Sequence, residues 1–177
     1  YDRVIEHLKM KDESGDTVRR LALQIANSRQ CSDAIKLGKE SLKIVRAPGK
    51  DEESFQSALR QVEKARDQLP NNPFVLNVLG TAQYRARKFE DALAILSFAH
   101  RTLADANHWP DPSNTAFLAM TLHQLGRFQE AQESLARFRD QTKGDQSNGN
   151  RFVRFSRNRE FPALLAEAEE LLKTAKE

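Results

Sequence analysis

The histidines and the single cysteine are the side chains most able to carry nucleophilic or metal chemistry. The histidines are His7, His100, His108 and His123. They fall on separate predicted elements, so no pair has the spacing of metal ligands. Cys31 has no partner motif nearby, and the carboxylates mostly occupy solvated helix faces. The sequence therefore predicts no catalytic residue, no metal site and no cofactor, and it predicts that this segment is not an enzyme.

Cations and aromatic rings alternate in one segment near the C-terminus. Its members are Arg151, Phe152, Arg154, Phe155, Arg157 and Arg159. This pattern is typical of segments that follow a phosphate backbone and stack on bases. The same residues also fit a loop whose rings pack on neighbouring helices while the arginines stay in water. Because the sequence shows no second basic patch and no nucleic-acid-binding motif, single-stranded nucleic-acid binding through residues 151–159 is a lower-ranked alternative.

The composition describes a folded chain of 177 residues, of which 39% are hydrophobic and 30% charged. These fractions exclude disorder over the whole length. No apolar run approaches the ~20 residues of a membrane-spanning helix, and the net charge of +3 is too small to indicate a membrane or nucleic-acid partner. The single cysteine excludes an internal disulfide and favours a reducing, cytoplasmic compartment. Because the chain opens with Tyr1 instead of Met, we expect it to be part of a longer protein.

Large and small apolar residues recur along the middle of the chain at a nearly constant interval. The first set returns after 34 residues and then, in shorter form, after a further 39. Such an interval is typical of stacked helix pairs. The extra residues of the second interval fall around two prolines, which forbid a continuous helix. The sets are Phe55, Ala58, Leu59, Val62 and Ala65; then Phe89, Ala92, Leu93, Leu96 and Ala99; then Phe128, Ala131, Leu135 and Phe138.

A partner helix precedes each of the last two sets. Asn72 is a good N-cap, with Pro73 in the first helical position. Ser113 opens the next partner helix, and Gly126 ends it in a left-handed cap. Small residues such as Gly80 stand where paired helices must approach closely, because a large side chain there would push the pair apart.

The repeated positions follow one pattern of small and apolar residues. They include Leu37-Gly38, Leu79-Gly80, Phe89, Ala92, Leu96, Ala99, Leu118-Ala119, Gly126, Phe128, Ala131 and Leu135. In this pattern the chain resembles the tetratricopeptide repeat (TPR) family, with Arg87 standing where the family usually has a turn glycine. Strings such as Arg46-Ala47-Pro48-Gly49 further resemble TPR regions attached to bacterial Ser/Thr protein kinases, although the kinase catalytic motifs themselves are missing from these residues.

The repeats and the resemblance predict an all-α fold, a right-handed α-solenoid of about three TPR-like helix pairs with capping helices at both ends. The last helix is expected to begin at Pro162, with its glutamates Glu167, Glu169 and Glu170 on the polar face away from the array. The predicted divisions are N-terminal helices in 1–30, a divergent repeat in 31–70, repeats in 72–104 and 113–141, a loop in 142–159 and a capping helix in 160–177.

The first helices of successive pairs in such a stack line a shared groove. The residues that the repeat pattern assigns to this groove are Lys36, Lys39, Lys43, Asn77, Thr81, Tyr84, Arg85, Phe117, Met120, His123 and Gln124. Their mixture of cations, amides and apolar groups suits an extended or helical peptide with some negative charge. Alternatively, the lysines form an ordinary solvated helix face, and Phe117 and Met120 belong to the core.

We therefore expect a non-catalytic protein-protein interaction module, a peptide-binding scaffold that by resemblance belongs to a larger bacterial multidomain protein such as a Ser/Thr kinase. The alternative is an oligomerisation or intramolecular docking domain whose groove holds a segment of its own parent. A membrane is not expected as a partner, and the sequence does not indicate the oligomeric state. Reversing the charge of Lys39 and Arg85 is expected to weaken partner capture without unfolding the array.

Overall fold

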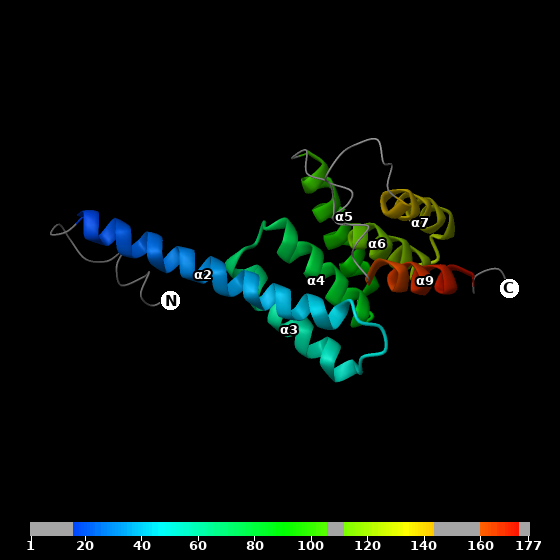
Figure 1. Cartoon of the computed structure of the whole chain (residues 1–177), viewed down its shortest axis with the longest axis horizontal. Helices are drawn as coiled ribbons and strands as arrows, with labels where there is room; N and C mark the ends of the chain where they lie inside the picture. The colour runs from blue at the N-terminus through cyan, green and yellow to red at the C-terminus, as the bar shows by residue number, and fades with distance from the viewer. Residues whose placement is uncertain (1–15, 106–111, 144–159, 174–177) are drawn as a thin grey trace.

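The computed structural model describes residues 16–105, 112–143 and 160–173. Within these ranges every regular element is an α-helix and no strand occurs (Figure 1), so the predicted all-α class is confirmed for them. The helices are α2 (Asp16–Val45), α3 (Glu52–Gln68), α4 (Pro73–Arg85), α5 (Phe89–Asp105), α6 (Pro112–Gln124), α7 (Phe128–Lys143) and α9 (Glu160–Lys173).

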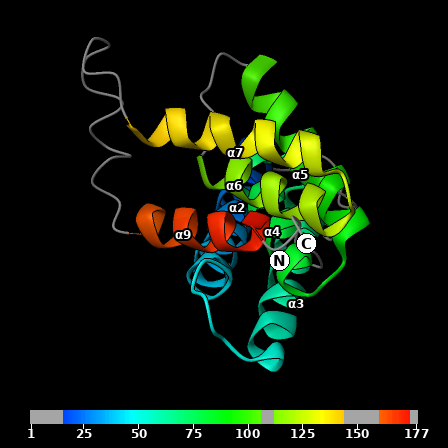
Figure 2. The same cartoon turned by 90° about the vertical axis from the view of Figure 1, so that its right-hand side faces the viewer.

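Each helix from α2 to α7 packs on the next one in the chain. The alternate helices α2, α4 and α6 also contact one another in that order, and α9 packs on α6 and α7. Figure 2 shows α9 beside these two helices, and Figure 1 shows the N-terminal half of α2 projecting away from the other helices. The fold is therefore repeat-like in its packing, with α9 added against the last pair.

Two apolar clusters form the core, and α4 belongs to both of them. Val75, Val78 and Leu79 pack in the cluster that α2 and α3 share, whereas Tyr84 packs in the cluster of α5, α6, α7 and α9. Helix α4 thus shares apolar contacts with the helices before it and after it in the chain.

The helix starts follow the capping signals in the sequence. The Asn72 side-chain oxygen accepts hydrogen bonds from the backbone N–H groups of Phe74, at 3.0 Å, and Val75, at 3.2 Å. Pro73 occupies the first turn of α4, as predicted. Helix α6 begins at Pro112, one residue before the predicted Ser113.

The turns inside the α4–α5 and α6–α7 pairs have the same backbone pattern. Arg87 N–H donates to the Tyr84 carbonyl at 3.0 Å, and Gly126 N–H donates to the His123 carbonyl at 3.0 Å. Both turn residues have positive φ, 59° at Arg87 and 73° at Gly126. Glycine adopts this region without strain, whereas an L side chain such as that of Arg87 rarely does. The two turns are equivalent although only one of them contains glycine.

Gly80 lies where α4 and α5 approach most closely. A Cβ atom added there would lie 2.5 Å from Leu96 Cγ and 3.3 Å from the Leu96 backbone nitrogen. Ala92 and Ala131, at equivalent places in α5 and α7, are completely buried. The requirement for small residues at these contacts is therefore confirmed.

The structure also differs from the sequence prediction at further helix boundaries, since α7 runs to Lys143, two residues into the loop predicted for 142–159. Helix α2 runs without interruption from residue 16 to 45, so no helix end separates an N-terminal helix from the divergent repeat at 30/31. Residues 16–45 contain no proline and a single glycine, Gly38, and nothing in them breaks a helix. Helix α9 begins at Glu160, two residues before the expected start at Pro162, because proline is accepted in the first turn of a helix.

Several sequence predictions lie outside the described residues. These are the helix expected at residues 4–8, His7, His108, and the segment 151–159 with its alternating arginines and phenylalanines.

Candidate functional site

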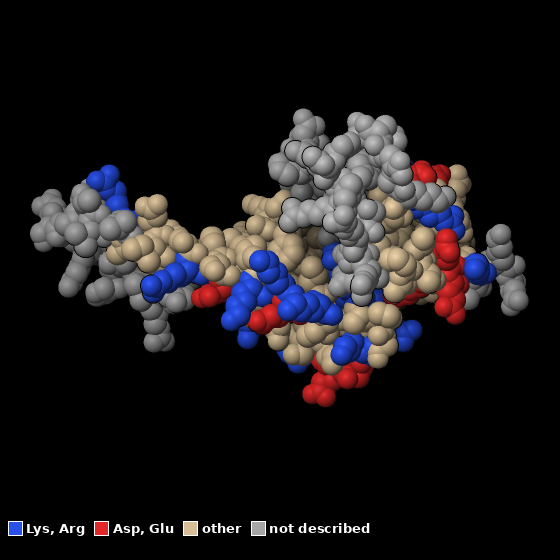
Figure 3. Space-filling view, in the orientation of Figure 1, with Lys and Arg blue, Asp and Glu red and all other residues tan. Residues whose placement is uncertain are grey.

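The three predicted lysines lie on one exposed face of α2. Lys36, Lys39 and Lys43 are all exposed, and their spacing of three and four residues places them on the same side of the helix. Figure 3 shows Lys and Arg side chains gathered over the C-terminal half of α2. We call these three residues the lysine face.

Asn77 and Thr81 lie inside the molecule. Their exposed fractions are 3% and 1%. The Asn77 side-chain oxygen accepts a hydrogen bond from the amide of Asn114 in α6, at 3.1 Å, and the Thr81 hydroxyl donates to the Asn77 carbonyl at 2.9 Å. The Asn77–Asn114 hydrogen bond joins α4 to α6.

Arg85 lies at the C-terminal end of α4 among three aromatic rings. Its guanidinium carbon is 5.2 Å from the ring centre of Phe117 and 5.7 Å from the ring centres of Phe55 and Tyr84. Tyr84 and Phe117 also meet edge to face, with their ring centres 5.5 Å apart. Cation–π attraction is strongest when the cation is shielded from water, and the Arg85 side chain is only 10% exposed.

Arg85 forms hydrogen bonds with α2, the first described helix, and with α9, the last one. Nε donates to the carbonyl of Val45, the last residue of α2, at 2.8 Å. Nη1 and Nη2 donate to the two carboxylate oxygens of Glu167 in α9, the Nη2 bond measuring 2.9 Å. One guanidinium therefore contacts α2, α3, α6 and α9 in addition to its own helix. We call Phe55, Tyr84, Arg85, Phe117 and Glu167 the Arg85 cluster.

The cluster changes the acidity of the Tyr84 hydroxyl. Burial, and after it the negative charge of Glu167, raise the pKa of Tyr84 to about 12. The positive charge of Arg85 acts in the opposite direction, but it is the smaller effect. The Tyr84 hydroxyl is therefore protonated at physiological pH.

Met120 and His123, the remaining predicted groove residues, are buried in α6. Met120 has no exposed surface, and His123 is 9% exposed. The His123 ring meets the ring of Phe128 edge to face, with their centres 5.2 Å apart, and burial lowers the pKa of His123. Gln124, next in the chain, is exposed.

Helix α9 packs one mostly apolar side on α6 and α7. Phe161, Leu164, Ala168 and Leu172 are all buried. The Phe161 ring packs edge to face on Phe138 of α7, with centres 6.3 Å apart. In α9, Glu169 accepts a hydrogen bond from Nε of Arg139 in α7 at 2.8 Å.

Two of the three glutamates expected to lie away from the array thus contact it instead. Glu167 binds Arg85 and Glu169 binds Arg139, whereas Glu170 is exposed as predicted. The helical period alone could not show this, because both arginine partners are distant in the sequence. Sequence reasoning also did not identify Val45, Phe55 and Asn114 as contacts of the predicted groove residues.

The structure thus divides the predicted site residues into two groups. Tyr84, Arg85 and Phe117 lie together under α9, and Asn77, Thr81, Met120 and His123 are buried nearby in α4 and α6. The lysine face is exposed on α2. Because Arg85 is enclosed by its contacts, reversing its charge would place a second carboxylate opposite Glu167, and these contacts lead us to expect that the change destabilises the fold.

The described residues offer little for metal or membrane chemistry. Among them, no three His, Cys, Asp or Glu side chains come together as metal ligands. Over the same residues, each helix is either too short or too polar to traverse a bilayer. A search of protein-family models found no match to the chain, and neither did comparisons with curated proteins and with solved structures.

Proposed function

We propose that this chain is a non-catalytic protein-protein interaction domain, built as a TPR-like array, that binds acidic protein segments along α2, α4 and α6. Support for the array comes from the equivalent turns at Arg87 and Gly126, which lie 39 residues apart, the same interval as the apolar repeat. The contacts that α2 and α6 make with α4 continue this order. The sequence resemblance favours a larger bacterial parent, such as a Ser/Thr kinase, in the cytoplasm.

One observation carries the binding proposal: α9, an amphipathic helix with acidic side chains, lies on α6 and joins its Glu167 to Arg85 of α4. These alternate helices therefore accept a helical segment through apolar contact and a paired carboxylate. Apolar anchors with a few fixed charges are the usual basis of helix recognition in a groove. The lysine face provides further exposed cations on α2.

The same contact favours intramolecular docking as the second candidate function. In that case α9 is the permanent occupant, and the array serves to hold a segment of its own chain. The two functions differ in whether a separate molecule is bound through the lysine face.

A capture experiment with a charge-matched control tests the proposed function. The triple variant Lys36→Glu, Lys39→Glu, Lys43→Glu is compared with a variant that makes the same charge change at three exposed cations elsewhere, Arg60, Lys64 and Lys88. Circular dichroism confirms that both variants are folded. We expect the proteins captured by the wild-type chain from a bacterial extract to be lost with the first variant and kept with the second. Equal capture by both would contradict a binding role of the lysine face.

A further inference from the structure

The buried side of α9 has a defined order of side chains. Phe161, Leu164, Ala168 and Leu172 follow one another at intervals of three or four residues, so they form one stripe along the helix. Glu167 lies next to this stripe, one position before Ala168, and delivers its carboxylate to Arg85. A helix with this order presents apolar anchors and one carboxylate to the same surface.

The cation that receives this carboxylate is held in place by other helices. The Val45 carbonyl fixes Nε of Arg85, and the rings of Phe55 and Phe117 lie against the guanidinium. None of these groups belongs to α9. The two Nη atoms are therefore oriented toward the α9 side before any carboxylate arrives, and a planar guanidinium oriented in this way recognises a carboxylate in a bidentate manner.

The lysine face adds cations that α9 leaves exposed. Lys43 and Val45 both lie in the last turn of α2, so the lysine face ends within one helical turn of the carbonyl that binds Arg85. A partner longer than α9, or with more carboxylates, gains contacts there that α9 does not make. This charge complementarity favours a separate acidic protein over α9 as the strongest ligand of the surface.

We propose that the surface beneath α9 is a binding site for an acidic amphipathic helix of a partner protein, and that α9 occupies this site in the free chain. The partner helix has the same order of side chains as α9. Counted from residue 161 as position i, this order is apolar residues at i, i+3, i+7 and i+11 and a carboxylate at i+6. This inference rests on the proposed function and adds the class of partner and its competition with α9. Because α9 belongs to the same chain, it competes with the partner helix for this surface. The partner binds only the molecules whose surface is free, so its apparent affinity falls as the fraction of molecules with α9 in place rises.

A labelled synthetic peptide of residues 160–173 serves as the probe, and the receptor is the whole chain in each case. The variant Glu167→Arg places a second cation opposite Arg85 and weakens the hold of α9, but it leaves the receptor surface unchanged. We expect the peptide to bind this variant about tenfold more tightly than the wild-type chain. The matched control is Glu170→Arg, the same charge change at an exposed position of α9, and it is expected to bind as the wild type does. A peptide that itself carries Glu167→Arg is expected to lose binding.

A second variant that weakens the packing of α9 shows whether the effect of Glu167→Arg comes from a folding defect. Leu164→Ala removes a buried anchor of α9 without placing a charge beside Arg85, and it is expected to raise the affinity for the wild-type peptide in the same direction. Circular dichroism and light scattering accompany each titration. Equal affinity of the peptide for the wild-type, Glu167→Arg and Leu164→Ala chains, or no binding to any of them, would overturn the proposal.

Two further outcomes separate this proposal from others. If light scattering shows that the wild-type chain forms dimers which the free peptide converts to monomers, the occupant is α9 of a second copy and our choice of partner is wrong. If the peptide fails to bind while capture through the lysine face persists, the proposed function stands and only the site beneath α9 is contradicted.

Discussion

Arg85 and Glu167 lie 82 residues apart in the chain, yet they form a bidentate ion pair between α4 and α9. The pair is largely shielded from water, since the side chains of Arg85 and Glu167 are 10% and 24% exposed. An ion pair in such a place differs from one on the surface: removing a single partner leaves a poorly hydrated charge without compensation. The account of the fold and of the binding surface depends on this contact.

A double-mutant cycle on Arg85→Ala and Glu167→Ala measures the strength of the pair. We expect a coupling free energy of about 1–3 kcal/mol from urea denaturation, because the two side chains share hydrogen bonds and a nearly dry environment.

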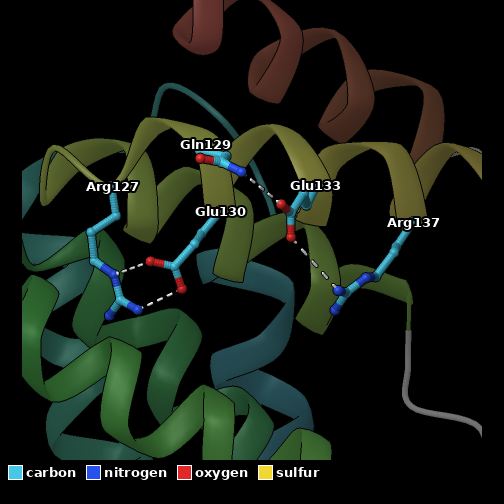
Figure 4. A network of polar contacts seen from close by, with 5 residues as sticks. All are labelled: Arg127, Gln129, Glu130, Glu133 and Arg137. Carbon is cyan, nitrogen blue, oxygen red and sulfur yellow. Dashed lines mark hydrogen bonds and ion pairs between the residues drawn. The ribbon is translucent and has the colours of Figure 1, made fainter.

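The control is the cycle on Arg127, just before α7, and Glu130 in its first turn, which pair (Figure 4) with side chains 46% and 52% exposed. Exposed pairs of this kind contribute little to stability, because water and salt screen the two charges. Equal coupling energies in the two cycles would show that the Arg85–Glu167 contact has no special role.

The close approach of α4 and α5 at Gly80 predicts a marked effect of one methyl group. In Gly80→Ala the new Cβ would lie 2.5 Å from Leu96 Cγ and close to its backbone, so the helices must separate, and we expect a net loss of about 1–3 kcal/mol in the free energy of unfolding.

Gly38→Ala provides the matched control, since its Cβ would meet only the edge of the Phe74 ring, at 2.9 Å. That ring is half-buried and can turn away, while alanine favours the helix by up to about 1 kcal/mol over glycine. We therefore expect little change or a small gain in thermal stability. A larger loss at Gly38 than at Gly80 would contradict the described packing.

The buried amide pair of Asn77 and Asn114 predicts that two substitutions cost less than one. In Asn77→Leu the Asn114 amide loses its 3.1 Å hydrogen bond and remains buried, for a loss of about 1–3 kcal/mol in the free energy of unfolding. Replacing both residues by leucine removes both polar groups, and we expect the double variant to be more stable than either single variant. Additive losses in chemical denaturation would argue against a direct contact.

Tyr84 predicts a titration that reports directly on Glu167. The protein has two tyrosines, Tyr1 and Tyr84, so the phenolate absorbance of a Tyr1→Phe chain belongs to Tyr84 alone. We expect a pKa of about 12, raised from the ordinary 10.0. Because the folded state holds this proton more tightly, the contribution of Tyr84 to stability is complete below pH 10 and is lost as the pH rises from 10 toward 12.

Glu167→Gln removes a negative charge that favours the protonated hydroxyl, so this variant is expected to lower the pKa of Tyr84 while burial keeps it above 10.0. Circular dichroism on the same samples identifies the pH at which the chain unfolds. Ionisation of Tyr84 near its ordinary pKa in a folded chain, with or without Glu167, would contradict the geometry of the Arg85 cluster.

The local features of this fold were predictable from the sequence because short-range chemistry determines them. Asn72 and Pro73 start a helix through contacts within four residues, and Gly126 ends one by adopting positive φ. Gly80 was predictable as a point of close helix approach because small residues recur at such positions in the repeat, although Leu96 was not identified as its contact. In each case the residues that decide the structure belong to the same helix pair.

The tertiary surroundings of the candidate site were not predictable in the same way. The helical period predicted that Glu167 lies on the polar face away from the array, but its carboxylate binds Arg85, and this contact depends on how α9 packs. The repeat pattern likewise marks Asn77 and Phe117 as members of alternate helices without showing that other helices cover them. Long-range packing decides these points, and a single sequence contains no local signal for it.

Solution NMR of the isotope-labelled chain tests the central claim, that α9 lies on the array beside Arg85, most directly. We expect nuclear Overhauser contacts between the rings of Phe138 and Phe161, whose centres are 6.3 Å apart, and between the Arg85 side chain and the ring of Phe117. A spectrum in which α9 is helical but shows no contact with α6, α7 or Arg85 would contradict the claim.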